Sequence, residues 1–178
     1  ESDVPDIEPD KLAGLLLILA FPCLLAVAAA GDLARYRIGN GLNITLALLY
    51  FPAAFVVGSD IETTAWHLGA GTTVLAVGLV LFVLDRLGGG DVKLLAAAAC
   101  WTGFSALPAF LIYVALSGGV LALFLLLARK LLANRLSETS SLARLFGATR
   151  DVPYGLAIAF GGFATLPRLD LIRSLLAS

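Results

Sequence analysis

The sequence predicts an all-α, polytopic integral membrane protein with six transmembrane helices. Apolar residues make up 60% of the 178 residues and charged residues only 14%, a balance that excludes a water-soluble domain of this size. The apolar residues form long runs without the alternation that is typical of a β-barrel. A helix needs about 20 apolar residues to cross a bilayer, and these runs approach or exceed that length.

The spans follow from the boundaries of the apolar runs. One stretch, 94–128, is too long for a single span, and the turn-forming residues of 103–108 (Gly-Phe-Ser-Ala-Leu-Pro) divide it into a fourth and a fifth span. The remaining four spans are bounded mainly by charge, glycine or proline, and they are 12–30, 42–58, 65–84 and 153–171.

We expect one membrane domain, 12–178, preceded by a polar tail. Five of the thirteen acidic residues lie within the first ten positions, so 1–11 is expected to be an acidic extracytoplasmic tail. The largest loop, about 129–152, is basic and places Leu142, Leu145 and Phe146 at helical spacing. It either lies on the membrane surface or is a plain connector.

Basic residues set the expected orientation, because Lys and Arg gather on the cytoplasmic side of short loops. Nine of the twelve follow the first, third or fifth span: Arg35, Arg37, Arg86, Lys93, Arg129, Lys130, Arg135, Arg144 and Arg150. Both termini are therefore expected outside. Every segment that follows an odd-numbered span is expected at the cytoplasmic face.

The first polar segment at that face, 31–42, contains a single acid, Asp32. A carboxylate costs about 3 kcal/mol at the centre of a membrane helix and less near the interface, so it usually has a function. Pairing with Arg35 and Arg37 among the lipid headgroups is an equal alternative. Asn40 and Gly41 then indicate a turn into the second span.

The second polar segment, 88–94, begins with Gly88, Gly89 and Gly90, directly before Asp91 and Lys93. Successive glycines permit backbone conformations that are closed to other residues. Irregular backbone beside a membrane helix usually lines a polar cavity, although an interfacial hinge with ordinary flanking charges is the alternative interpretation.

The third segment, 151–155, places Pro153, Tyr154 and Gly155 at the start of the last span. Proline is tolerated in the first turn of a helix. The segment is therefore a candidate wall of a site that the other two segments form. His67, at the start of the third span, is expected to pack at the opposite interface.

Asp32 and Asp91 are thus predicted at one membrane face, although the sequence does not show that they meet. Two neighbouring carboxyls do not ionise together easily, so one keeps its proton while the other is charged, and they titrate as a unit. The charged member activates water and the protonated member stabilises the oxyanion. Such chemistry needs no metal or organic cofactor.

These three segments resemble motifs of the type IV prepilin peptidases, the Gly-x-Gly-Asp intramembrane aspartyl proteases. Gly88 to Asp91 is similar to the Gly-x-Gly-Asp motif itself, and 152–158 to the Pro-Phe/Tyr-Gly segment of the last helix. Asp32 with Asn40 and Leu42 resembles the first aspartate motif, in which Gly39 replaces a common proline. The resemblance implies that Asp32 and Asp91 are catalytic. The three glycines, Lys93, Asn40 and the Pro153 segment then bind substrate or shape the site.

The resemblance also implies a substrate: a prepilin or pseudopilin whose short basic leader is removed at the cytoplasmic face of a bacterial inner membrane, ahead of its apolar helix. Larger members carry a cytoplasmic insert and methylate the new amino terminus. The short connection between the first two spans is similar to the protease-only form of Flp/Tad pili, with an archaeal preflagellin peptidase as the alternative. Lipid is the other expected partner, and no nucleic acid is expected.

Two other functions remain open at this point. A small transporter or proton channel would use the same aspartates as ion sites, but it should carry polar groups near the middle of the membrane. A non-catalytic assembly subunit of a pilus or secretion machine would not need the aspartates at all. Cleavage of a prepilin distinguishes both from a protease.

Overall fold

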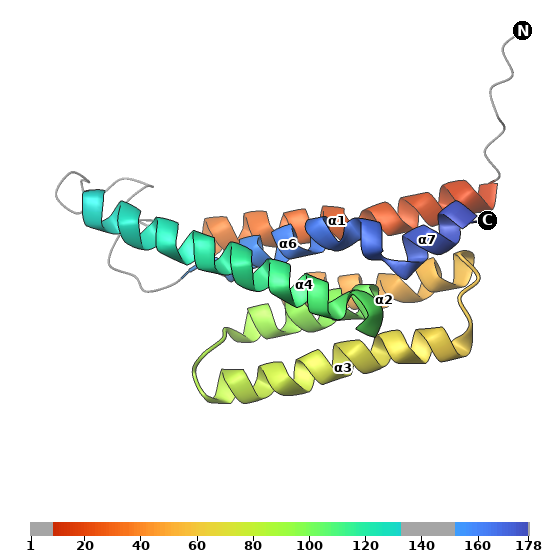
Figure 1. The fold of residues 1–178 in the computed structure, drawn as a ribbon, viewed down its shortest axis with the longest axis horizontal. Helices are drawn as coiled ribbons and strands as arrows, with labels where there is room; N and C mark the ends of the chain where they lie inside the picture. Colours follow the sequence, from red (N-terminus) through yellow and green to blue (C-terminus); the bar gives the residue numbers. More distant parts are fainter. Residues whose placement is uncertain (1–8, 133–151, 178) are drawn as a thin grey trace, which may run out of the picture.

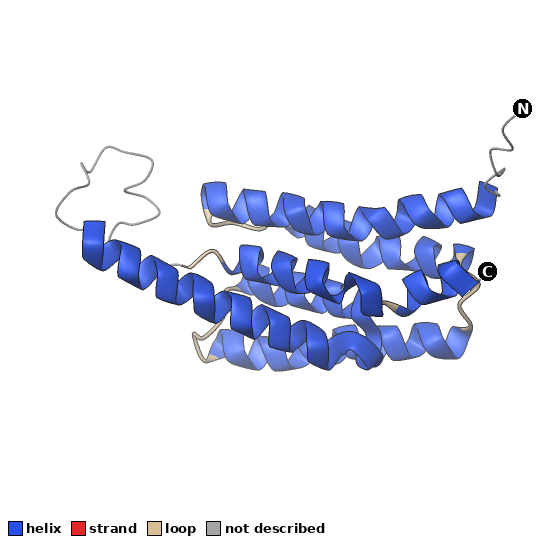
Figure 2. Ribbon diagram, turned by 45° about the horizontal axis from the view of Figure 1, so that its top comes forward, coloured by secondary structure: helices blue, strands red, loops and turns tan. Residues whose placement is uncertain are grey.

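The described part of the chain in this computed structural model, 9–132 and 152–177, is helical and contains no β-strand (Figure 2). The all-α prediction is therefore confirmed for these residues. The elements are α1 (Pro9–Arg35), α2 (Asn40–Val56), α3 (Ile61–Val83), α4 (Gly89–Leu132), α6 (Tyr154–Thr165), the 3₁₀ helix η1 (Leu166–Arg168) and α7 (Asp170–Ala177). Most of the predicted tail and of the loop at about 129–152 lies outside the described residues.

The helices lie side by side, and α1 begins at the end of the bundle where α7 ends (Figure 1). Helix α4 packs against α2, α3 and α6, and α1 packs against α2 and α6. Small residues permit this close approach, as is usual between membrane helices. A Cβ atom added at Gly78, for example, would lie 2.7 Å from a Val92 methyl group.

Helix α4 is broken at Gly103, which has φ 58° and ψ 177°. The predicted break at 103–108 is therefore present, and Gly103 makes it, while Pro108 lies inside the helix that follows. Only glycine adopts this conformation readily. We call 89–102 the first half of α4 and 104–132 its second half; the chain folds back between them (Figure 1).

The predicted count of six spans is not confirmed. Among the described residues, four helices are long and apolar enough to cross a membrane: Lys11–Arg35, Ile61–Val83, Gly89–Ala128 and Tyr154–Leu176. The second predicted span corresponds to the shorter apolar helix Asn40–Val56. The fourth and fifth fall within α4, because the break at Gly103 interrupts the helix without an intervening loop.

An aromatic cluster fixes α1, α2 and α4 relative to one another. The rings of Phe21 and Trp101 stack with centroids 5.1 Å apart, and Tyr50 meets Trp101 edge to face at 6.0 Å. The indole N–H of Trp101 donates a hydrogen bond of 2.8 Å to the carbonyl oxygen of Leu46. All three rings are fully buried, so these helices form a rigid support for the segments at their ends.

Candidate active site

Asp32 lies in the last turn of α1 and is buried, with 6% of its surface exposed. The backbone N–H of Gly155 donates a hydrogen bond of 2.7 Å to its Oδ2 atom. This N–H belongs to the first turn of α6, where backbone donors have no partner within the helix. The positive end of the helix dipole also favours a carboxylate there. Asp32 is thus held at the N-terminus of α6.

Gly155 permits this contact because it has no side chain. A Cβ atom at this position would lie 2.9 Å from both Cβ and Oδ2 of Asp32, which is too close for the present arrangement. Pro153 precedes the helix as its N-cap residue with φ −70°, so the ring fixes the entry of the chain into α6. Of the third sequence segment, Gly155 is therefore the residue in direct contact with Asp32.

Asp91 is the third residue of α4, and its carboxylate accepts a hydrogen bond from the backbone N–H of Gly88. This is the geometry by which an acidic residue caps the start of its own helix. A Cβ atom at Gly88 would lie 2.7 Å from Oδ2 of Asp91. Gly88 therefore provides both the donor and the space that the carboxylate needs.

The end of α1 and the start of α4, which carry Asp32 and Asp91, lie at the same end of the bundle (Figure 1). Their carboxylates are close enough for the charge of Asp32 to act on Asp91. No ion pair joins Asp32 to Arg35 or Arg37 in the part of the chain that the structure describes, so the headgroup-pairing alternative has no support there. The two carboxyls come from segments distant in the sequence, and each accepts a hydrogen bond from a glycine N–H.

Asn40 and Lys93 join the start of α2 to the first half of α4. The Nζ atom of Lys93 donates a hydrogen bond of 2.8 Å to Oδ1 of Asn40. Lys93 is two residues from Asp91, or roughly 200° around the helix, so it projects away from the face on which Asp91 lies. The hydrogen bond therefore joins α2 to the side of α4 that lies away from Asp91.

Asn43 contacts the glycine segment, although it was not among the predicted site residues. Its side-chain amide is buried and donates a hydrogen bond of 3.4 Å to the carbonyl oxygen of Gly90. An amide within an apolar span is itself a signal, because polar groups inside membrane helices usually have a partner.

Gly89 and Gly90, which follow Gly88, permit close packing. A Cβ atom at Gly89 would lie 3.3 Å from the Phe82 ring, and one at Gly90 would lie 3.4 Å from Ile38.

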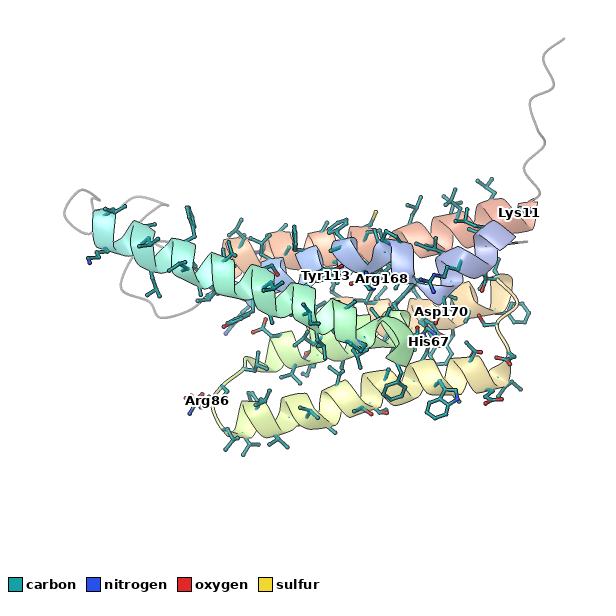
Figure 3. The ribbon with its side chains drawn as sticks, viewed as in Figure 1. Lys11, His67, Arg86, Tyr113, Arg168 and Asp170 are labelled. Carbon is teal, nitrogen blue, oxygen red and sulfur yellow. The ribbon has the colours of Figure 1, made fainter. Side chains whose placement is uncertain are left out.

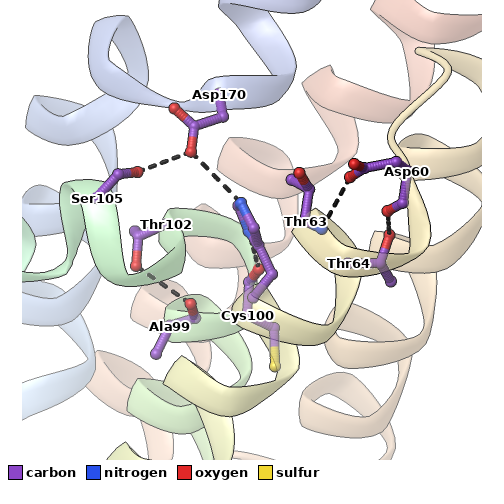
Figure 4. A network of polar contacts seen from close by, with 9 residues as sticks. Asp60, Thr63, Thr64, Ala99, Cys100, Thr102, Ser105 and Asp170 are labelled. Atoms are coloured by element: carbon purple, nitrogen blue, oxygen red, sulfur yellow. Dashed lines mark hydrogen bonds and ion pairs between the residues drawn. The ribbon is translucent and has the colours of Figure 1, made fainter.

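A second polar cluster contains His67 and Asp170. It lies away from the end of the bundle at which Arg86 marks the turn between α3 and α4 (Figure 3). His67 is buried with its ring stacked on Tyr50, and its Nδ1 atom lies 2.8 Å from the carbonyl oxygen of Cys100. Its Nε2 atom lies 3.5 Å from Oδ2 of Asp170, to which Ser105 donates a hydrogen bond of 2.7 Å (Figure 4). The predicted packing role of His67 agrees with this burial.

Comparisons with known proteins bear on the aspartate site. A family model described as the type IV leader peptidase family matches residues 19–123, which include both Asp32 and Asp91. A prepilin leader peptidase/N-methyltransferase of Pectobacterium carotovorum subsp. carotovorum is 32% identical over 119 residues. That match covers 63% of this chain and 41% of the relative, so it spans less than half of that protein. No solved structure matches the chain.

Proposed function

The chain belongs to the type IV leader peptidase family, and we propose that it is a membrane-embedded aspartyl endopeptidase that removes the short basic leader from prepilins or pseudopilins. Asp32 and Asp91 are its catalytic residues. One observation carries the proposal: two carboxylates from segments far apart in the sequence lie within electrostatic range of each other at the end of the bundle. Such a pair is difficult to keep ionised and is the arrangement that aspartic proteases use.

In the proposed reaction the ionised carboxylate takes a proton from a water molecule as the water oxygen attacks the peptide carbonyl. The protonated carboxyl donates its hydrogen to the developing oxyanion. Collapse of the tetrahedral intermediate breaks the C–N bond, and the departing amine receives a proton from the pair. The glycine N–H donors stay on the carboxylates throughout and keep them oriented.

We also propose that this end of the bundle faces the cytoplasm. The turn between α3 and α4 carries Arg86 (Figure 3), and the basic residues predict a cytoplasmic location for it. The first helix would then begin, and the last would end, on the extracytoplasmic side. The six predicted passes correspond in this proposal to α1, α2, α3, the two halves of α4, and α6 with α7.

Within the family we propose the protease-only form that serves Flp/Tad pili in a bacterial inner membrane. The connection between α1 and α2 is 36–39, which leaves no space for a cytoplasmic insert between these helices. The two cysteines, Cys23 and Cys100, lie in different helices and are free. The larger members that methylate the new amino terminus carry a cytoplasmic insert. Because α1 and α2 are joined by a short connection here, we expect no methylation.

The test is cleavage of a liposome-embedded prepilin by the parent protein and by Asp32→Asn and Asp91→Asn. The matched control is Asp85→Asn, the same substitution at an exposed acid of the turn before α4. We expect cleavage by the parent and the control and none by the two folded variants. Cleavage that persists in either variant, or a folded parent that cleaves no prepilin, would contradict the proposal and favour a transporter or an assembly subunit.

A further inference from the structure

An apolar groove of about 580 Å³ lies between α3 and the second half of α4. Val77, Gly78 and Leu81 form one wall, and Leu111, Ala115 and Gly119 form the other. Leu95 of the first half of α4 and Ile158 of α6 also line the groove. Most of these side chains are apolar.

One end of this groove lies beside the aspartate pair. Leu95 lines the groove, and it follows Asp91 by four residues, so the two side chains lie on the same face of the helix. Two further lining residues are chain neighbours of the glycines that hold the carboxylates: Leu87 precedes Gly88, and Tyr154 precedes Gly155. This end of the groove therefore lies near the site.

A second apolar groove, of about 470 Å³, lies on another face of the same helix. Lys93, Ala97 and Cys100 line it, together with residues of α2 and α3. Because Lys93 projects roughly 200° away from Asp91, the first half of α4 separates this groove from the carboxylate of Asp91. Its lining also includes Asn40 and Asn43, which contact the first half of α4, so the control position is taken from its α3 wall, at Thr72.

The length of the groove beside the aspartates suits a helix that packs against it with one face. Its wall on α4 extends from Leu107 to Ala122, a length of about 22 Å at the rise of an α-helix. The small residues of this wall permit close approach of a partner helix, and a Cβ atom added at Gly119 would meet nothing within 4 Å. In hydrocarbon a polypeptide must satisfy its own backbone hydrogen bonds, which a helix does.

We propose that this groove, lined by α3 and the second half of α4, binds the apolar helix of the substrate and delivers the adjoining peptide bond to the aspartates. The inference rests on the proposed function, because it takes the occupant to be the polypeptide that is cleaved. Contact with the groove selects a substrate by its membrane helix, whereas the aspartates act on the peptide bond.

The first test is photo-crosslinking in liposomes that contain a full-length prepilin. A photoreactive amino acid replaces Gly119 in one protein and Thr72 in the other, both in the Asp32→Asn background so that the substrate stays intact. Thr72 lines the second groove and bonds only to carbonyls of its own helix among the described contacts. We expect adducts with the prepilin from position 119 and not from position 72. Adducts from position 72 alone, or adducts with lipid alone, would overturn the inference.

A kinetic test separates this inference from the proposed function. Gly119→Leu fills the groove, and Thr72→Leu is its control. Each is assayed on the full prepilin and on a soluble peptide that contains the cleavage site but lacks the apolar helix. We expect Gly119→Leu to lower kcat/KM for the prepilin about tenfold more than for the peptide. Equal losses on both substrates would overturn the inference while leaving the protease assignment intact, and absence of peptide and prepilin cleavage by the parent would refute the assignment itself.

Discussion

The two polar clusters of the bundle each contain an aspartate, but the partners of these aspartates differ. Asp170 faces complementary side chains, the hydroxyl of Ser105 and the ring of His67. Asp32 instead lies within electrostatic range of another carboxylate, that of Asp91, and it accepts a hydrogen bond from the backbone N–H of Gly155. The side chains near the aspartate are therefore complementary to it in one cluster and of like charge in the other.

Under the proposed function, this difference separates a structural role from a catalytic one. The His67 cluster connects α3, α4 and α7 through the hydrogen bond of Ser105 to Asp170 and the contacts of the His67 ring. The His67 Nδ1 atom faces a carbonyl oxygen, which only accepts, so Nδ1 carries the proton. Two carboxylates within electrostatic range of each other instead oppose folding when both are ionised. Proteins keep such unfavourable arrangements where function needs them.

The largest effect should come from removing one charge of the pair. Asp91→Asn is expected to lower kcat for prepilin cleavage by about 10²-fold to 10⁴-fold or more, because a general acid–base group is lost. The midpoint of thermal unfolding in detergent should stay the same or rise, because repulsion between like charges is relieved. A variant whose unfolding temperature falls together with its activity would place Asp91 among the structural residues, as a helix cap.

A smaller loss should follow from displacing Asp32 without changing its charge. Gly155→Ala adds a Cβ atom 2.9 Å from Oδ2 of Asp32, and a displacement of about 1 Å costs up to about 100-fold in rate. Gly41→Ala is the control, because a Cβ atom there meets nothing within 4 Å. Single-turnover cleavage rates measure both, and equal rates would show that the Gly155 contact does not orient Asp32.

The other cluster should respond in stability and not in chemistry. Gly103→Ala forces a side chain into a conformation with φ 58° and places its Cβ 2.7 Å from the His67 ring. We expect a loss of about 1–3 kcal/mol in the free energy of unfolding, measured by thermal or denaturant unfolding. Cleavage per folded molecule should change much less than in Gly155→Ala. A comparable loss of cleavage would show that the two clusters do not differ in role.

The smallest effect is expected at Asp60, which caps α3 near the His67 cluster (Figure 4). Hydrogen bonds from the side chain and backbone N–H of Thr63 hold the pKa of the Asp60 carboxyl below its usual value. The resulting stabilisation is present at neutral pH and is lost as the pH falls below about 4. Asp60→Ser keeps an uncharged cap, so its unfolding temperature should depend less on pH over this range than that of the parent.

The sequence predicted the helices better than their ends. Expected spans 12–30 and 65–84 correspond to α1 and α3, but α1 continues to Arg35 and α3 begins at Ile61. Hydropathy marks the lipid boundary, whereas hydrogen bonds decide where a helix ends. α3 therefore begins after its N-cap Asp60, and α1 ends before Tyr36, which adopts φ 51°.

Composition and spacing alone determined that the chain is an all-α membrane protein and that its long apolar stretch breaks near Gly103. They also identified Asp32 and Asp91 as candidate site residues. These properties depend on residue type and on neighbours along the chain. Tertiary packing decided that the two carboxylates lie within electrostatic range of each other, that Gly155 holds Asp32, and that Asp170 reaches His67. Each of these contacts joins residues distant in sequence, and only the packing of the helices fixes which side chains share a face.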